Sequence, residues 1–287
     1  MRRIFLIGLV LAVGAAALLA YQYVMTARAE NVTVYAAPTL AVLANDAKAR
    51  MQSPYNVTVI VIGSAAAVRR IEQGAVPDAL LSVDAELVNY VKQYRSVTSL
   101  GNFKLNLICR EKTTLEELSR KRIGLANPNT APIGYRAIAA LYWMAVKRNI
   151  FKVEDLERYL SVKFEAAQDR VIIEMREFKA SGPFLARDDL SASFQLLENG
   201  AVDCIFAYVP FAVSRNLEGK YAVISLPEEI SFGSDPPMRF IARITLGELE
   251  VKRFEAVAIA FTDKGERFVR EVVELLRLNP ARYGLGV

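Results

Sequence analysis

The chain has 287 residues, with 36 basic and 31 acidic side chains, two cysteines and no histidine. Without histidine there are no Ser–His or Cys–His nucleophile pairs and no histidine metal sites, and two cysteines are too few for a zinc cluster, so we expect no enzyme, no resident metal and no cofactor. Residues 1–29 hold three arginines and no acid, so the formal charge of +5 falls to +2 in the remainder, which is no nucleic-acid-binding footprint.

The N-terminal segment has the pattern of an export signal. Arg2 and Arg3 precede an uncharged run over residues 4–25, and Ala27-Arg28-Ala29 offers small residues for cleavage. The run is also about long enough to cross a bilayer, so it is either a cleaved signal peptide or an uncleaved membrane anchor. In both cases we expect an exported protein on the extracytoplasmic face of the cell membrane, secreted or anchored by residues 4–25.

After this segment, strand and helix patterns alternate along the chain. Strands are predicted at 32–36, 57–62, 79–82 and 103–110, and helices at 39–52, 64–73 and 84–94. The unbroken β-branched run at 57–62 is typical of a strand that is buried on both faces. Alternation of this β-α-β kind predicts a doubly wound sheet with right-handed crossovers.

The alternation restarts in the second part of the chain. Strands are predicted at 122–126, 203–208, 221–226, 238–246 and 254–261, and helices at 133–148, 191–199 and 264–278, whereas residues 150–190 show no clear period. We therefore expect an α/β protein of two doubly wound lobes of discontinuous sequence, with a ligand cleft between them. The expected lobe 1 combines 30–109 with 209–287, and the expected lobe 2 is the inserted segment 110–208. Strands near 103–109 and 203–208 would cross between the lobes.

Four segments place a hydroxyl, a glycine or a proline where a strand leads into a helix. They are Tyr35-Ala36-Ala37-Pro38-Thr39-Leu40, Gly63-Ser64-Ala65-Ala66, Asn127-Pro128-Asn129-Thr130-Ala131-Pro132-Ile133-Gly134-Tyr135-Arg136 and Asp203-Cys204-Ile205-Phe206-Ala207-Tyr208. Backbone N–H groups at helix starts are unpaired and lie at the positive end of the helix dipole, so they suit anions. If these starts converge on one cleft, they form a pocket for a small oxyanion. The alternative is that Thr39 and Ser64 are ordinary N-caps.

In the order and spacing of these segments, the chain resembles the molybdate/tungstate-binding proteins of ABC importers, of the archaeal type, which have the type II periplasmic-binding-protein fold. The resemblance covers most of the chain after residue 29 and includes residues 77–84 and 226–230. It implies that the hydroxyls of Thr39 and Ser64, the backbone N–H of Ile133 and the phenol of Tyr208 hold the ligand. Further contacts are expected nearby, from Pro38, Ala65, Asn127, Gly134, Tyr135 and Ser191.

The chain also differs from the family pattern. The relatives add carboxylates to the metal of the anion, one in the loop before the Pro-X-Gly turn and one just before the phenol. Here residues 126–135 contain no acid, Ala207 precedes Tyr208, and Pro210 stands where a serine is usual. We therefore expect a tetrahedral oxyanion that is held only by hydrogen bonds. Molybdate or tungstate is favoured, and another anion such as sulfate stays open.

The two cysteines lie on the strands that are expected to cross between the lobes. Cys109 ends one of them and Cys204 begins the other. In an oxidising compartment they can form a disulfide across the hinge, and two buried thiols are the alternative.

The expected function is that of an extracytoplasmic solute-binding protein of an ABC importer. Its permease and ATPase would be separate chains, because the sequence has no Gly-rich Lys phosphate loop and no series of membrane spans. Membrane association would come from the tether or from docking to the permease. Two rival interpretations stay open: a membrane-anchored sensory ectodomain, and an enzyme on the same fold that would use acids such as Asp78, Asp84, Asp203 or Glu228.

Overall fold

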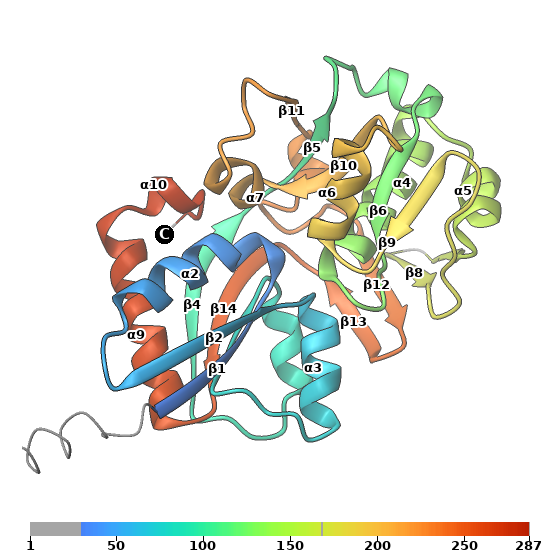
Figure 1. Ribbon diagram of the computed structural model, residues 1–287. Helices are drawn as coiled ribbons and strands as arrows, with labels where there is room; N and C mark the ends of the chain where they lie inside the picture. Colours follow the sequence, from blue (N-terminus) through green and yellow to red (C-terminus); the bar gives the residue numbers. More distant parts are fainter. Residues whose placement is uncertain (1–29, 168, 287) are drawn as a thin grey trace, which may run out of the picture.

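The computed structural model describes residues 30–167 and 169–286. The strands form three mixed sheets with helices packed around them (Figure 1). The expectations for residues 1–29, a signal peptide or a membrane anchor, lie outside the described residues. Within the described ranges, no helix is both long and apolar enough to cross a membrane.

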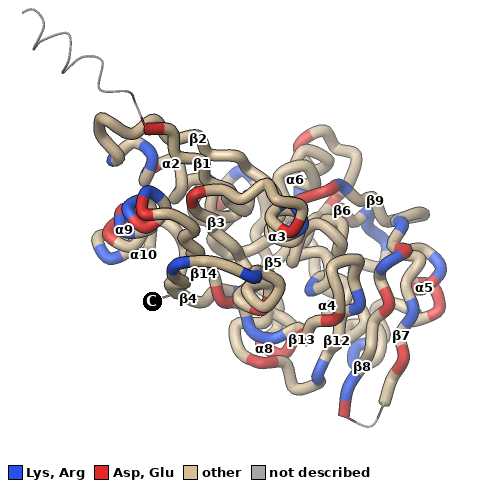
Figure 2. The backbone as a smooth tube through the Cα atoms, turned by 90° about the horizontal axis from the view of Figure 1, so that it is seen from below, with Lys and Arg blue, Asp and Glu red and all other residues tan. Residues whose placement is uncertain are grey.

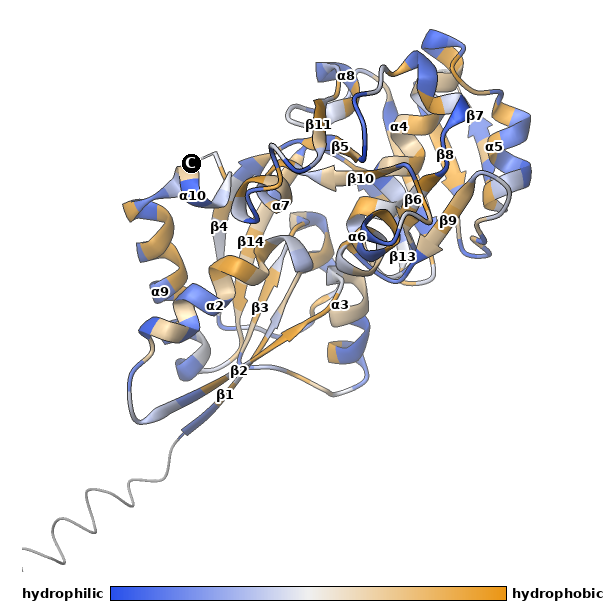
Figure 3. Ribbon diagram, turned by 45° about the horizontal axis from the view of Figure 1, so that its top comes forward, coloured by the Kyte–Doolittle hydropathy of each residue, from blue (hydrophilic) through white to orange (hydrophobic). Residues whose placement is uncertain are grey.

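The first sheet contains strands from both ends of the described chain. Its order is β2 (Tyr55–Val61), β1 (Glu30–Ala36), β3 (Ala79–Ser82), β14 (Phe254–Ala260) and β4 (Ser96–Phe103). β1, β2 and β3 are parallel, and β14 runs antiparallel to β3 and β4. The helices α2 (Ala41–Arg50) and α9 (Asp263–Leu278) pack together on one side of the sheet, and α3 (Ser64–Glu72) lies on the other (Figure 1). The central strands β3 and β14 are strongly apolar (Figure 3).

One expectation for this sheet is wrong. β2 was expected to be buried on both faces, but it is an edge strand that pairs only with β1 among the strands of this sheet. Val57 is buried, whereas Val61 is 43% exposed. A β-branched run favours the strand conformation, but it does not determine where in the sheet the strand lies.

The other two sheets enclose the helix α4 (Pro132–Arg148). One has the order β11 (Ala222–Ser225), β5 (Leu105–Cys109), β10 (Cys204–Tyr208), β6 (Ile123–Ala126) and β9 (Phe184–Arg187), and the other β13 (Gly247–Val251), β12 (Arg239–Ile244), β8 (Arg170–Glu174) and β7 (Lys163–Ala166). α4 contacts β6 and β10 on one side, and its Tyr142 packs against Phe164 and Phe240 of the other sheet. Its residues are buried from Pro132 to Ala145. A helix that is mostly apolar and buried on all sides suits this position between two sheets.

The other helices of the described chain are mostly short. They are α5 (Val153–Leu160), α6 (Leu190–Glu198), α7 (Val209–Ser214), α8 (Glu228–Ser231), α10 (Pro280–Tyr283), and the 3-10 helices η1 (Pro38–Leu40), η2 (Ala85–Tyr90) and η3 (Glu116–Arg120). η2 replaces the longer helix expected at 84–94. α5, β7, β8 and β9 occupy residues 150–190, where the sequence showed no clear period.

Sheet membership divides the chain differently from the expected lobes. β5, β11, β12 and β13 lie in the second and third sheets, so the chain leaves the first sheet after β4 and returns at β14. The expected lobe 1 includes 105–109 and 222–251, whereas their strands pair in the second and third sheets, where only the β12–β13 pairing is local in sequence. Below, lobe 1 means the first sheet with its helices, and lobe 2 means the other two sheets with theirs. The expected α/β class is confirmed, and its sheets are mixed.

The expected disulfide joins Cys109 to Cys204. The two residues face each other on the antiparallel strands β5 and β10, with Cα atoms 4.1 Å apart, and both are fully buried. Both strands belong to one sheet of lobe 2. The bond therefore lies within lobe 2 and strengthens it. A bond across the hinge had been expected, and this one does not cross it.

Replacement of both cysteines by alanine is expected to lower the free energy of unfolding by about 2–4 kcal/mol, because the bond restricts the unfolded chain between residues 95 apart. Urea denaturation of the wild type and of the Cys109→Ala/Cys204→Ala variant measures this difference. Equal stability of the two proteins would show that the bond contributes nothing.

Candidate ligand-binding site

One small cavity lies where the starts of five helices meet between the lobes. It is lined by Ala37, Pro38, Thr39, Gly63, Ser64 and Val83 from lobe 1 and by Ala131, Pro132, Ile133, Leu190 and Tyr208 from lobe 2. None of these side chains carries a charge. The space open to the centres of water-sized spheres is about 10 Å³, which is about the room that one water molecule needs. The cavity therefore suits only a compact ligand, and even a tetrahedral anion of five heavy atoms needs its walls to move slightly apart.

The lobes touch beside this cavity. The backbone N–H of Ala66, in the first turn of α3, donates to the carbonyl oxygen of Thr130 in lobe 2 at 3.0 Å. A side-chain carbon at Gly63 would overlap the same carbonyl oxygen, so this approach requires glycine. The structure is thus the closed arrangement of the two lobes.

Lobe 1 presents donors from η1 and α3. Thr39 and Ser64 are buried at these two helix starts. The Ser64 Oγ accepts a hydrogen bond from the Val83 N–H at 3.2 Å, which leaves its own hydrogen available for another acceptor. The N–H groups of Ser64 and Ala65 have no acceptor within the helix, because they belong to its first turn.

Lobe 2 presents donors from α4 and from the end of β10. Pro132 begins α4, and the next residue, Ile133, has a first-turn N–H without an intrahelical acceptor. Tyr208 ends β10 and is 1% exposed. The Arg136 guanidinium lies near the Tyr208 oxygen, but within the described residues this hydroxyl makes no hydrogen bond of ordinary geometry and its hydrogen has no acceptor. A hydroxyl left unpaired in a buried position costs about 1–3 kcal/mol. A ligand that brings an acceptor to this hydroxyl would remove that cost.

The structure brings together part of the predicted set. Thr39, Ser64, Ile133, Tyr208 and Pro38 line the cavity, whereas Ala65, Asn127, Gly134, Tyr135 and Ser191 do not. Sequence reasoning did not select Ala37, Gly63, Val83, Ala131, Pro132 or Leu190. Most of these adjoin a selected residue within the same motif. For Val83 and Leu190, no sequence motif indicated a position in the cavity lining, because that position depends on how the lobes meet.

The predicted residues outside the lining have other partners. The Asn127 Oδ1 accepts from the Asn129 N–H at 2.9 Å and holds the loop before α4. The Gly134 N–H donates to the Ala131 carbonyl at 2.9 Å. Near Ser191, the carboxylate of Asp189 caps α6 by accepting from the Ala192 N–H at 2.9 Å, and this negative charge makes the α6 start a poor anion donor.

A buried ion pair joins the lobes next to this cavity. Arg136 of α4 donates to the Asp84 carboxylate at 2.6 Å, and the Tyr135 hydroxyl donates to the same carboxylate oxygen. Asp84 belongs to lobe 1, where its Oδ1 also accepts from the Glu86 N–H at 3.1 Å and caps η2. Asp84 is therefore a capping and interlobe residue.

Aromatic rings connect this pair to the cavity wall. The Arg136 guanidinium lies 4.2 Å from the centre of the Phe254 ring, and the Tyr208 ring packs edge-on against the same ring at 4.6 Å. Burial raises the pKa of the Tyr208 phenol well above its ordinary value, and the charge of Arg136 offsets only part of this shift. Burial and the charge of Asp84 raise the pKa of Tyr135 in the same way. Both phenols therefore stay protonated, and both remain donors, throughout the physiological pH range.

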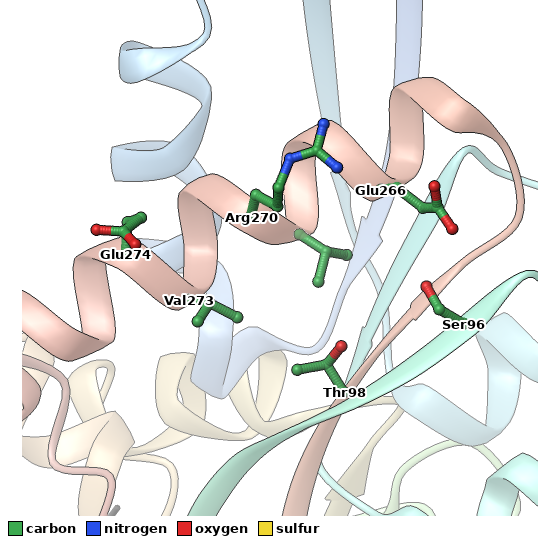
Figure 4. Close-up of a pocket in the computed structure, with 7 residues that line it drawn as sticks. Ser96, Thr98, Glu266, Arg270, Val273 and Glu274 are labelled. Carbon is green, nitrogen blue, oxygen red and sulfur yellow. The ribbon is translucent and has the colours of Figure 1, made fainter.

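A larger hollow of about 430 Å³ lies away from the lobe boundary, between α9 and β4 (Figure 4). Ser96 and Thr98 from β4 and Glu266, Arg270 and Glu274 from α9 line it. These side chains are half-buried or exposed, and Glu266 already pairs with Arg95 at 3.6 Å. Acidic and basic residues are interspersed along α9 (Figure 2). This hollow has the character of an ordinary charged surface.

The described part of the chain contains no group of three or more cysteine, histidine, aspartate or glutamate residues placed to hold a metal ion. Its polar cavity groups are hydroxyls and backbone N–H groups, which donate hydrogen bonds to anions.

The chain belongs to the family of bacterial extracellular solute-binding proteins, whose model matches residues 32–267. Members of this class bind a small ligand and serve ABC transporters. An extracellular location agrees with the disulfide, since such bonds persist in oxidising compartments. A search of curated proteins finds no match.

Solved structures share the fold at low sequence identity. The Azotobacter vinelandii periplasmic molybdate-binding protein has a TM-score of 0.62 and 13% identity, over 89% of this chain and 99% of that one. The substrate-binding domain of a putative molybdenum ABC transporter from Clostridium difficile has a TM-score of 0.50 and 15% identity, over 90% of this chain and 99% of that one. The regulatory domain of HypT from Salmonella typhimurium, in its apo form, has a TM-score of 0.52 and 14% identity, over 87% and 97%. The fold is that of type II periplasmic-binding proteins.

The interlobe ion pair gives a stability prediction. Asp84→Asn leaves the buried Arg136 without a counter-charge, so the free energy of unfolding should fall by about 3–5 kcal/mol. The matched control is Asp203→Asn, which removes the partner of Arg122 in an exposed pair and should cost less than about 1 kcal/mol. Urea denaturation of both variants makes the comparison, and equal losses would contradict the importance assigned to burial.

Proposed function

We propose that this protein binds a small tetrahedral oxyanion between its two lobes and delivers it to an ABC permease. The observation that carries the proposal is the Tyr208 hydroxyl, which is buried in the cavity wall and unpaired within the described residues. Such a donor favours a ligand that brings an acceptor. An anion with four equivalent oxygens offers acceptors in every direction from one compact centre.

The other cavity groups fit the same chemistry. The Ser64 hydrogen is available because the Oγ lone pair accepts from Val83, and Thr39 and Ile133 add a hydroxyl and a backbone N–H. A buried dianion must recover its lost hydration through such donors. Each hydrogen bond to a charged group contributes about 1.5–3 kcal/mol, so five to seven donors can offset desolvation and lobe closure. The helix starts add favourable dipole potential.

The lining favours fully deprotonated anions. The cavity wall contains no carboxylate side chain, so a ligand hydroxyl would meet no charged acceptor there. A protonated oxyanion such as hydrogen phosphate therefore donates only to neutral oxygens, in a weaker hydrogen bond than a carboxylate would accept. Molybdate, tungstate and sulfate carry no proton at neutral pH and need no such acceptor.

Molybdate or tungstate is the favoured cargo, and sulfate is the alternative. The motif resemblance supports this choice, and the likeness to the Azotobacter molybdate-binding protein supports it through the shared fold. Because no carboxylate lines the cavity, the metal of the anion keeps its four oxygens and gains no protein ligand. The permease and its ATPase would be separate chains.

Isothermal calorimetry of the purified protein with molybdate, tungstate, sulfate and phosphate tests the proposal. We expect molybdate or tungstate to bind most tightly, and phosphate to bind at least about tenfold more weakly, since about 1.4 kcal/mol corresponds to one decade. Affinity should not change between pH 7 and pH 9, because the raised pKa of Tyr208 keeps its donor hydrogen in place. Absence of heat with all four anions would remove the assigned cargo.

The Tyr208→Phe variant separates binding from folding. Removal of the hydroxyl should weaken anion binding by about ten- to a hundredfold, because one charge-assisted hydrogen bond is lost. It should not destabilise the free protein, because the lost hydroxyl is unpaired there. Calorimetry and urea denaturation without ligand measure the two effects.

Tyr135→Phe is the matched control for this variant. Its hydroxyl donates to Asp84 and lies outside the cavity lining, so its loss should destabilise the free protein. If Tyr208→Phe instead behaves like Tyr135→Phe and leaves affinity unchanged, Tyr208 is a packing residue.

A further inference from the structure

Arg215 lies directly behind the cavity wall. It follows α7, the helix that begins after Tyr208, and its Nη2 donates to the Pro38 carbonyl oxygen at 2.9 Å. Pro38 itself lines the cavity. The guanidinium also stacks on the Phe211 ring, with its central carbon 3.9 Å from the ring centre. The charge of Arg215 is thus held one residue away from the site, between α7 of lobe 2 and η1 of lobe 1.

This charge has no counter-ion in residues 30–167 and 169–286, since Arg215 forms no ion pair there. Its Nη1 is buried and has no hydrogen-bond partner within the same ranges. Arg136 differs, because Asp84 cancels its charge at 2.6 Å. Burial lowers the pKa of Arg215, as expected for a cation that loses water without gaining a carboxylate. A guanidinium nevertheless stays protonated in proteins.

An unpaired cation beside a cavity of neutral donors is costly for the free protein and useful for an anion complex. Arg215 is partly buried and keeps some contact with solvent, so a nearby negative charge would stabilise it further. The cavity lies beyond the Pro38 carbonyl and holds no acidic side chain in its lining. A bound anion is the group that would supply this negative charge.

We propose that Arg215 determines the charge preference of the site: it stabilises the bound anion through space, while the hydroxyls and backbone N–H groups make the contacts. This inference rests on the proposed oxyanion function and deepens it. Coulomb energy is proportional to the charge of the ligand, so a dianion gains twice as much from Arg215 as a monoanion of the same shape. Arg215 therefore selects doubly charged tetrahedral anions.

The test compares tungstate with perrhenate, a tetrahedral anion of similar shape with one negative charge less. Calorimetry at constant ionic strength measures both dissociation constants for the wild type and for Arg215→Gln, which keeps a donor amide and removes the charge. We expect tungstate binding to weaken by about 30-fold and perrhenate binding by about fivefold, because the logarithm of the loss follows ligand charge. The preference for tungstate over perrhenate should fall by about sixfold.

Two further variants separate charge from structure. Arg215→Lys keeps the charge without the planar stacking group, so it should retain the tungstate preference even if both affinities fall equally. Arg148→Gln is the matched control, since Arg148 also lies over an aromatic ring, Trp143, at 5.8 Å. Arg148 ends α4 and Ile133 lies near its start, about 22 Å away at 1.5 Å per residue, so this change should alter neither affinity.

Equal losses for both anions in Arg215→Gln, or no loss, would overturn the role of Arg215 and leave the oxyanion function standing. If Arg215→Gln does not fold, Arg215→Lys alone is compared with the wild type. A preference of Arg215→Lys for tungstate over perrhenate that is about sixfold below that of the wild type would then overturn the role of Arg215 as well. A wild type that binds no tetrahedral anion would remove the oxyanion function, and the Arg215 proposal with it.

Discussion

The buried ion pair between Asp84 and Arg136 is the contact on which the closed arrangement depends. Each of these charges costs several kcal/mol to bury alone, and each finds its partner only when the lobes meet. The Tyr135 hydroxyl and the Lys252 carbonyl add hydrogen bonds to the pair, and the Arg136 Nε has no partner within the described residues. Because Arg136 lies on Phe254, and Phe254 packs against Tyr208, the position of the cavity phenol follows from this contact.

The charges around the cavity therefore have separate tasks. The charges of Asp84 and Arg136 cancel each other, and this pair holds the lobes together. Arg215 has no counter-ion within the described residues and lies between α7 and η1. The lining itself is neutral and made of donors and apolar side chains. Contact groups can then be selected for shape and hydrogen bonding, while charge is supplied from behind. If the site binds an anion, as we propose, this separation would let it do so without a lysine or an arginine in its wall.

Local sequence signals predicted the elements that form the cavity, because helix starts depend on neighbouring residues. Gly63-Ser64 and the proline at 132 placed the starts of α3 and α4 within one residue of the structure. The β-strand pairing was not predictable in this way. β11 pairs with β5 and β12 with β8, both far away in sequence, and a short β-branched run looks the same at an edge as in a centre.

The same limit applies to single side chains of the site. Tyr135 was expected near the ligand because it follows the Pro-X-Gly turn, but its hydroxyl is bonded to Asp84. It stands two residues after Ile133 on a helix of 3.6 residues per turn, so the two side chains point in opposite directions. Val83 and Leu190 line the cavity because of how the two lobes meet, and a local sequence pattern carries no information on contacts between lobes.

The strand order of the first sheet determines when lobe 1 can be completed. β14 stands between β3 and β4, yet its residues follow the whole of lobe 2 in the chain. As the chain is synthesised, β3 and β4 therefore wait with open backbone edges while some 150 residues are added, and such edges invite pairing with other chains. The lobe that is made first is the last to become whole, so it is the part of the molecule that most needs protection on its way out of the cell.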